Sequence, residues 1–197
     1  MIYSVRGDLI LMDAGYAVVE CGGVGYRVQT SVNTQKQLKL NTEVMLYTHM
    51  NVREDAMELF GFATKSELNT FKLLINITGV GPKVALAILS ELTAEQIAMC
   101  VSSNDSKTLT RANGVGPKLA QRIVLELKDK IKGFDSYGSE FEVSHGSVVA
   151  DTGNVSKAVA ALAVFGYSAA DVTPILSRLD TSMTVEEMIT ATLRQMV

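Results

Sequence analysis

The feature that most constrains this chain is a repeat within it. Residues 74–92, LINITGVGPKVALAILSEL, return thirty-five positions later as residues 109–127, LTRANGVGPKLAQRIVLEL. Ten of the nineteen aligned positions are identical, and the longest unbroken match is Gly-Val-Gly-Pro-Lys. Self-similarity of this kind indicates that one supersecondary unit is used twice. We therefore expect two copies of one local structure in the middle of the chain.

Each copy is predicted to form a helix, a tight turn and a second helix. The two glycines let the chain reverse sharply around a buried valine, and a proline follows where the first helical residue belongs, because its missing N–H costs nothing there. The N–H groups of the turn and of the helix N-terminus then point at one place, which suits a nucleic-acid phosphate when lysine is adjacent. The residues assigned to DNA binding are Gly79, Val80, Gly81, Lys83, Gly114, Val115, Gly116, Lys118 and Arg122.

This is the pattern of the helix-hairpin-helix motif, which grips the backbone of duplex DNA across the minor groove without reading its sequence. The alternative is that Gly-Val-Gly-Pro only connects two helices, and two full copies in tandem argue against it. A phosphate-loop NTPase is excluded, because neither copy has the spacing of a Walker sequence.

The first sixty-odd residues are predicted to be β-structure. Short apolar runs at 2–12, 17–21, 26–30, 44–52 and 57–62 are separated by turn signals such as Gly22-Gly23. Five short strands in this length favour a small barrel of the OB type.

The C-terminal part is predicted to be a small helical module. Gly166 is placed to end one helix, and Ser168 and Thr184 are placed to begin two more. The fold class is therefore α+β and multidomain: an OB-like β-barrel over 1–64, a central all-α tandem helix-hairpin-helix domain over 65–133, a flexible linker over 134–153, and a three-helix module over 154–197.

The charge of the chain is distributed unevenly. The net charge of −3 divides into −2 for residues 1–64, +4 for 65–133 and −5 for 134–197. A basic middle between acidic ends indicates that one segment meets phosphate and that the others have different tasks. The N-terminus lacks the pattern of a signal peptide, no apolar stretch is long enough for a membrane span, and the two cysteines have no metal-ligand spacing, so a cytoplasmic protein is expected.

With tandem hairpins after an OB-like barrel and before a helical tail, the whole chain resembles the RuvA family, the junction-recognition subunits of the bacterial branch-migration complex. The similarity extends over residues 1–7, 19–28, 52–56, 59–62 and 159–167, and so includes the barrel and the tail as well as the hairpins. The resemblance implies binding of four-way (Holliday) junction DNA in recombination, DNA repair and the SOS response to DNA damage. It also implies a homotetramer, and leaves open one tetramer or an octamer of two stacked tetramers.

The resemblance further implies an acidic pin, the β-hairpin turn that carries Glu54 and Asp55 with Arg53 beside them. Four such pairs at the centre of a tetramer would repel phosphate and discourage linear duplex from lying across it. Without the resemblance, these residues would be interpreted as a solvated hairpin tip.

The family's third segment docks on a RuvB-type ATPase motor, and a RuvC-type resolvase is a further partner to consider. An acidic module on a tether suits partner binding. The apolar candidates for that contact are Leu162, Phe165, Tyr167 and Ile175, although a three-helix module needs the same residues for its own core.

The rival class is an enzyme, because helix-hairpin-helix units also occur in glycosylases, nucleases, ligases and polymerases. No histidine is paired with a cysteine, no His/Cys cluster has metal spacing, and no aromatic pocket for a flipped base is evident. We therefore expect no catalytic residue, no metal and no cofactor, with the ATPase on a separate chain. A third class, a barrel that binds single strands, is disfavoured because the first domain is slightly acidic.

Overall fold

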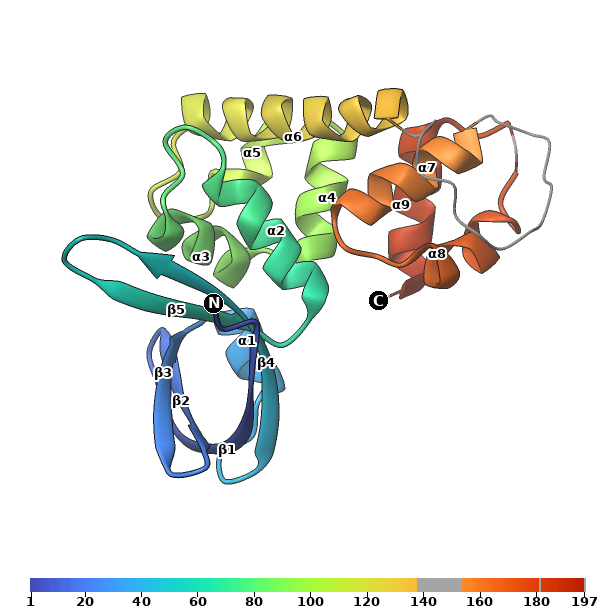
Figure 1. Ribbon diagram of the computed structural model, residues 1–197. Helices are drawn as coiled ribbons and strands as arrows, with labels where there is room; N and C mark the ends of the chain where they lie inside the picture. The colour runs from blue at the N-terminus through green and yellow to red at the C-terminus, as the bar shows by residue number, and fades with distance from the viewer. Residues whose placement is uncertain (138–153, 181, 197) are drawn as a thin grey trace. The chain divides into compact units, whose positions relative to one another are not determined.

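The computed structural model describes residues 1–137, 154–180 and 182–196. It divides into two compact units, Met1–Ala94 with Arg111–Val115, and Glu95–Thr110 with Gly116–Val197. Each unit is described by itself (Figure 1). The first unit combines a β-barrel with helices, and the described part of the second is helical, so the expected α+β class is confirmed.

Five strands close into a barrel in the order β1-β2-β3-β5-β4. Neighbouring strands are antiparallel except β3 and β5, which run parallel and meet at Gln29 and Phe60. The OB-like barrel predicted for the first sixty-odd residues is thereby confirmed. The strands are β1 (Ser4–Asp13), β2 (Tyr16–Cys21), β3 (Val24–Gln29), β4 (Glu43–Val52) and β5 (Met57–Phe62).

Local sequence accounts for the β2–β3 turn and for the barrel interior. Gly22 and Gly23 have φ values of +59° and +85° between the paired residues Cys21 and Val24, which is the two-residue turn that matches the twist of a hairpin. Alternate residues face inward, because side chains on a strand point to opposite faces in turn. The barrel core is formed by Val5, Leu9, Ala17, Val19, Val28, Leu46 and Leu59.

The β4–β5 hairpin reaches beyond the barrel core. Its last pair is Val52 with Met57, whose side chains are 59% and 73% exposed. In Figure 1 this hairpin projects past the other strands of the barrel. Its turn therefore presents residues 53–56 to solvent.

A short helix, α1 (Val32–Gln37), lies between β3 and β4 and was not expected from the sequence. It begins at Ser31, whose hydroxyl accepts a hydrogen bond from the backbone N–H of Thr34 at 3.1 Å. Six residues are too few to display a helical period, so the N-cap serine was the only signal for it.

Two helices follow the barrel in the first unit, α2 (Lys65–Ile75) and α3 (Pro82–Glu91). The ring of Phe71 lies 5.2 Å from that of Phe60 and 4.9 Å from that of Phe62, measured between centroids. All three rings are fully buried. An apolar face of α2 thus packs against β5.

The second unit continues with α4 (Ala94–Ser102), α5 (Ser106–Leu109) and α6 (Pro117–Tyr137). Helix α6 extends four residues into the segment predicted as a linker. The remainder of that segment, residues 138–153, lies outside the described residues.

The predicted three-helix module is confirmed as α7 (Asn154–Val164), α8 (Ala169–Leu176) and α9 (Val185–Met196). Gly166 has a φ of +93° and ends α7 by the Schellman pattern, since Tyr167 N bonds to Leu162 O and Gly166 N to Ala163 O. Ser168 and Thr184 cap α8 and α9, as predicted.

Across the described ranges, no single helix has the length and hydropathy of a membrane span. The bent pair of α3 and α4 reaches those values only when the two helices are counted together.

The cap of α9 should make the stability of the protein depend on pH. The backbone N–H and hydroxyl of Thr184 donate to Glu187 Oε2 at 2.9 and 3.0 Å, and these bonds, the backbone bond first, lower the pKa of Glu187. The stability that they add is complete above the ordinary pKa of about 4.3 and is lost as pH falls through the lowered value. Thr184→Ala removes the hydroxyl and should move the Glu187 pKa back toward its ordinary value in a carboxyl NMR titration.

Thr190→Ala is the matched control, because the Thr190 hydroxyl bonds to Glu186 O on the same helix and leaves Glu187 alone. An unchanged Glu187 pKa in Thr184→Ala would contradict the role of the hydroxyl.

Candidate nucleic-acid interface

The first hairpin joins α2 to α3 as the repeat predicts. Gly79 has a φ of +93°, and the following Val80 is 4% exposed, with its N–H bonded to Ile77 O at 2.9 Å. Gly81 is the N-cap of α3 and offers no side chain to cap it, and Pro82 fills the first helical position. The first-turn N–H groups of α3 therefore have no side-chain cap and face solvent beside exposed Lys83.

The second hairpin has the same local geometry. Gly114 has a φ of +82°, Val115 is 6% exposed, and its N–H bonds to Ala112 O at 3.1 Å. Pro117 opens α6, and Ala120 N bonds to Gly116 O at 2.9 Å, as Ala85 N bonds to Gly81 O at 3.0 Å in the first copy. The expectation that the repeat encodes one turn twice is confirmed.

The two alanines shared by the copies are fully buried. Ala85 of α3 and Ala120 of α6 have no exposed surface. A methyl side chain at these positions leaves room for close packing of neighbouring backbone. A Cβ placed on Gly114 would lie 3.5 Å from Cγ2 of Val84, so the second turn contacts α3 directly.

The basic side chains assigned to the hairpins are at the surface. Lys83, Lys118 and Arg122 are exposed, and Arg122 Nε lies 3.9 Å from Glu126 Oε1 one turn along α6. An exposed pair of this kind contributes little free energy and can exchange for a phosphate. Arg111, which precedes the second turn, is also exposed. It was not among the sequence candidates, although it aligns with Asn76 in the repeat and adds charge to the second copy.

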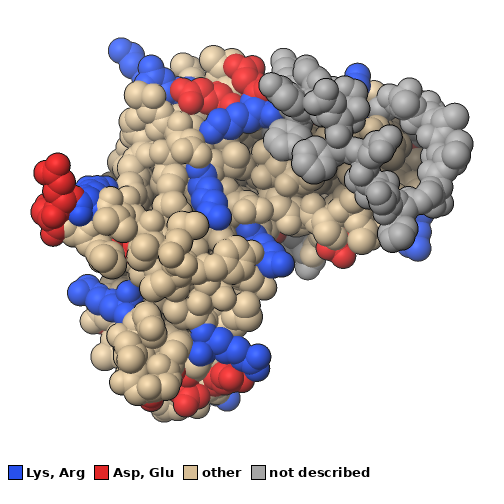
Figure 2. Space-filling model, viewed as in Figure 1, with Lys and Arg blue, Asp and Glu red and all other residues tan. Residues whose placement is uncertain are grey.

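The acidic pin is the turn between β4 and β5. Arg53, Glu54 and Asp55 are all exposed, and Arg53 N bonds to Ala56 O at 2.8 Å to close the turn. Figure 2 shows acidic side chains gathered at the tip of this hairpin, with basic ones beside them.

A groove joins the acidic pin to the first hairpin. One side is lined by Arg53, Asp55, Ala56 and Glu58, and the other by residues 81–84. The structure thus brings together two sets of predicted residues that lie almost thirty positions apart in the chain. Negative charge on one side faces Lys83 and the N-terminus of α3 on the other.

The described residues include two cysteines and one histidine. Cys21 is half-buried and Cys100 is buried, and neither forms a disulfide within the described residues. His49 packs its ring edge-on against Phe71, and burial, followed by the charge of Lys72, lowers its pKa. No three His, Cys, Asp or Glu side chains within residues 1–137, 154–180 and 182–196 are grouped so that they could hold a metal ion.

The residues proposed for partner binding occupy different environments. Leu162 and Phe165 are buried, Ile175 is half-buried, and the Tyr167 hydroxyl donates to Glu95 Oε1 at 2.6 Å. Their part in a partner contact stays a prediction.

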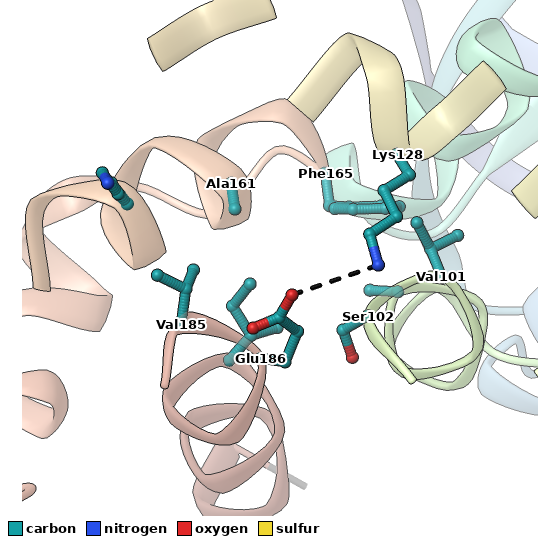
Figure 3. A pocket seen from close by; sticks show the side chains of 10 residues that line it. Val101, Ser102, Lys128, Ala161, Phe165, Val185 and Glu186 are labelled. Atoms are coloured by element: carbon teal, nitrogen blue, oxygen red, sulfur yellow. Dashed lines mark ion pairs between the residues drawn. The ribbon is translucent and has the colours of Figure 1, made fainter. Parts of the chain in front are cut away.

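Phe165 also lines a mostly apolar pocket within the second unit. Figure 3 shows residues of α4, α6, α7 and α9 around it, with Lys128 Nζ directed at Glu186 Oε1, 4.0 Å away. Sequence reasoning did not predict this pocket, because its lining comes from segments far apart in the chain.

Comparison with known proteins gives matches over the barrel and over the tandem hairpins. A family model described as the RuvA N-terminal domain matches residues 1–61, and one described as a SAM-like helix-hairpin-helix tandem matches residues 71–129. Together they cover more than half of the sequence.

Curated relatives extend the similarity over the full length. Three proteins named Holliday junction branch migration complex subunit RuvA illustrate it. The one from Acetivibrio thermocellus is 41% identical over 90% of this chain and 89% of its own length. Those from Chlorobaculum parvum and Shewanella loihica are each 40% identical over 100% of this chain, and over 98% and 100% of their own lengths.

Substitution by alanine should affect stability differently at the two glycines of the second turn, Gly114 and Gly116. Gly114→Ala should cost about 1–2 kcal/mol of unfolding free energy, because an L-residue is strained at positive φ. Crowding is not the cause, since the contact of its Cβ with Val84 is of ordinary length. Gly116 lacks a positive φ and has open space around it, so Gly116→Ala should change stability by less than about 0.5 kcal/mol. Urea unfolding measures both, and equal losses would contradict the assigned turn geometry.

Proposed function

The chain belongs to the RuvA family, and from this membership we propose that it binds Holliday junctions and presents them to a separate branch-migration motor. It acts as the DNA-binding subunit and carries out no catalysis, and the ATPase resides on another chain. The observation that carries the proposal is the pair of hairpins with one geometry. Each offers an N-terminal turn beside an exposed lysine.

The hairpins bind the DNA backbone rather than its bases. Backbone N–H groups at a helix N-terminus, together with a lysine, match the negative charge of a phosphate. Contacts of this type fix a protein on the duplex without carrying sequence information. Gly79, Gly81 and Lys83 hold backbone at the first hairpin, and Gly114, Gly116, Lys118 and Arg122 hold it at the second. Val80 and Val115, which are buried, contribute by anchoring the two turns.

The acidic pin selects junctions over linear duplex. Glu54 and Asp55 are exposed at the end of a two-stranded arm, and Asp55 shares a groove with the first hairpin. A duplex passing straight over the pin brings phosphate against these carboxylates, whereas separated strands at a junction pass on either side. Arg53 holds a strand beside the pin.

The proposed assembly is a tetramer whose four-fold symmetry matches four DNA arms. Apolar side chains exposed on the outer surface of the barrel, among them Tyr3, Ile10 and Met45, support contacts between subunits. One tetramer and an octamer of two stacked tetramers are distinguished by analytical ultracentrifugation with and without junction DNA.

The proposed division of labour follows the predicted domains. Residues 1–64 and 65–133 hold the junction, 134–153 form a tether, and 154–197 bind a RuvB-type motor, with a RuvC-type resolvase as a further partner. The net charge of −5 over residues 134–197 supports a protein partner rather than DNA. The setting is recombination and DNA repair, including the SOS response, in the cytoplasm.

Removal of a hairpin lysine should weaken binding to every DNA alike. Lys83→Ala should lower affinity for junction and duplex by a similar factor and reduce the slope of log affinity against log salt by about 0.9, because one phosphate contact is lost.

Gly81→Ala should also weaken binding without loss of stability, because its Cβ has open space in the free protein and would meet an approaching backbone.

Lys39→Ala is the matched control, since Lys39 is an exposed lysine of the barrel outside both hairpins. Electrophoretic mobility shift with duplex at several salt concentrations measures the slopes. An unchanged slope in Lys83→Ala would remove the first hairpin from the interface.

Neutralisation of the pin should erase selectivity. The double variant Glu54→Gln/Asp55→Asn should bind linear duplex more tightly while its junction affinity changes less, because the repulsion acts on duplex lying across the centre. The readout is the ratio of affinities for a synthetic four-way junction and for linear duplex with the same arm sequences.

Glu186→Gln/Glu187→Gln removes the same charge from another adjacent exposed pair and should leave the ratio unchanged. Equal affinity of the unaltered protein for the two DNAs would overturn the junction assignment and leave a general duplex-binding protein.

A further inference from the structure

A buried carboxylate connects the barrel to the helices that follow it. Glu67, in the first turn of α2, is 6% exposed. Its Oε2 accepts hydrogen bonds from the backbone N–H and hydroxyl of Thr64, at 3.1 and 3.3 Å, and completes a capping box. Its Oε1 accepts from the hydroxyl of Thr34 in α1, at 3.0 Å, and Thr34 has no exposed surface. One oxygen therefore caps a helix and the other reaches a separate element of the barrel.

A second capping box in the same chain provides a comparison. Thr184 and Glu187 form the same local hydrogen bonds at the start of α9, but there both residues are exposed. Capping alone therefore does not require burial. Burial of a carboxyl group costs free energy unless its oxygens are satisfied, and the bond from Thr34 lowers that cost for Oε1 of Glu67.

Helix α1 makes a second attachment at the other helix of the first hairpin. Asn33 Nδ2 donates to Leu89 O at 2.8 Å, and Val32 N donates to Ser90 Oγ at 3.0 Å. Both acceptors lie near the end of α3, and the hairpin turn lies at its beginning. Helix α3 has only ten residues and moves as a rigid body. The hydrogen bonds near its C-terminal end therefore fix the direction of the turn at its N-terminal end.

Helix α1 is in turn fixed to the barrel. Gln35 Nε2 donates to the carbonyl oxygens of Asp13 and Tyr16, at 2.7 and 3.3 Å, and Leu38, which follows α1, packs on the barrel core. The β4–β5 arm extends from the same barrel, with β5 stacked on α2 through Phe71. The barrel, which carries the acidic pin, and the helices of the first hairpin are thus connected through α1 and Phe71. The pin and the hairpin face each other across the groove described above.

We propose that the Thr34–Glu67 bond is a positioning link that sets the separation of the acidic pin and the first hairpin, and so the selectivity of the protein for junctions. The proposal rests on the proposed function for its DNA readout. Thr34 and Glu67 touch no DNA and act through the width of the groove. A hydrogen bond to a buried carboxyl group suits this role, because its directional geometry permits one arrangement where apolar packing permits several.

The test uses three isosteric or conservative substitutions in the full-length chain. Thr34→Val removes the hydroxyl and keeps the shape, Thr34→Ser restores a hydroxyl, and Thr70→Val is the matched control. Thr70 is fully buried on α2, and its hydroxyl has no hydrogen-bond partner in the structure. Thermal unfolding identifies temperatures at which all three variants are folded.

Two readouts are then taken at such a temperature. Thr34→Val should lower the junction-to-duplex affinity ratio by about fivefold, the scale of one lost hydrogen bond. The change should come mainly from tighter binding of duplex, because a pin that is no longer held opposite the hairpin repels duplex less. Spin labels on Met57→Cys and Asn76→Cys, in a Cys21→Ser background, should report a broader distribution of distances between pin and hairpin. Thr34→Ser and Thr70→Val should match the unaltered protein in both readouts.

A folded Thr34→Val protein with an unaltered ratio and a narrow distance distribution would overturn the positioning link. Failure of the proposed function is a different result: the unaltered protein would fail to distinguish junction from duplex, while the distance measurement would still decide whether the link fixes the pin.

Discussion

The left-handed backbone at Gly79 and Gly114 is the constraint on which the interface depends. A φ near +90° turns the chain so that the next residue, a valine, points into the core while the helix that follows begins at the surface. The proline then occupies the first helical position, where an N–H would have no partner within the helix. The same residue that buries the valine thus exposes the N-terminal N–H groups, and stability and anion binding arise from one local conformation.

A positioned turn also needs a fixed orientation, and the barrel supplies it through α1. The Glu67 carboxylate and the carbonyl of Leu89 both receive side-chain donors from this short helix. Phe71 adds an apolar contact between α2 and β5, and such a contact does not require one particular angle between the two elements. Apolar packing holds the barrel and the helices of the first hairpin together, and the hydrogen bonds from α1 determine the angle at which they meet.

Sequence reasoning found what depends on local chemistry. The glycine, valine and proline of each repeat dictate their own conformations, and the caps at Ser168 and Thr184 follow from residue type and spacing. It could not find α1, which is shorter than two helical turns. Nor could it separate Thr64–Glu67 from Thr184–Glu187: the two are the same local signal, and only the tertiary structure buries one of them. The burial of Leu162 and Phe165 depends likewise on how α7, α8 and α9 pack.

The repeat is symmetric in its turns but not in its outward faces. Ser90 of the first copy accepts a hydrogen bond from α1, whereas the aligned position in the second copy is Leu125, which is exposed. The copies also differ at other exposed positions, such as Asn76 of the first copy and Arg111 of the second. The turn that both retain has stayed identical through Gly-Val-Gly-Pro-Lys. The second copy thus keeps the geometry of the turn, while Leu125 leaves its outward face exposed.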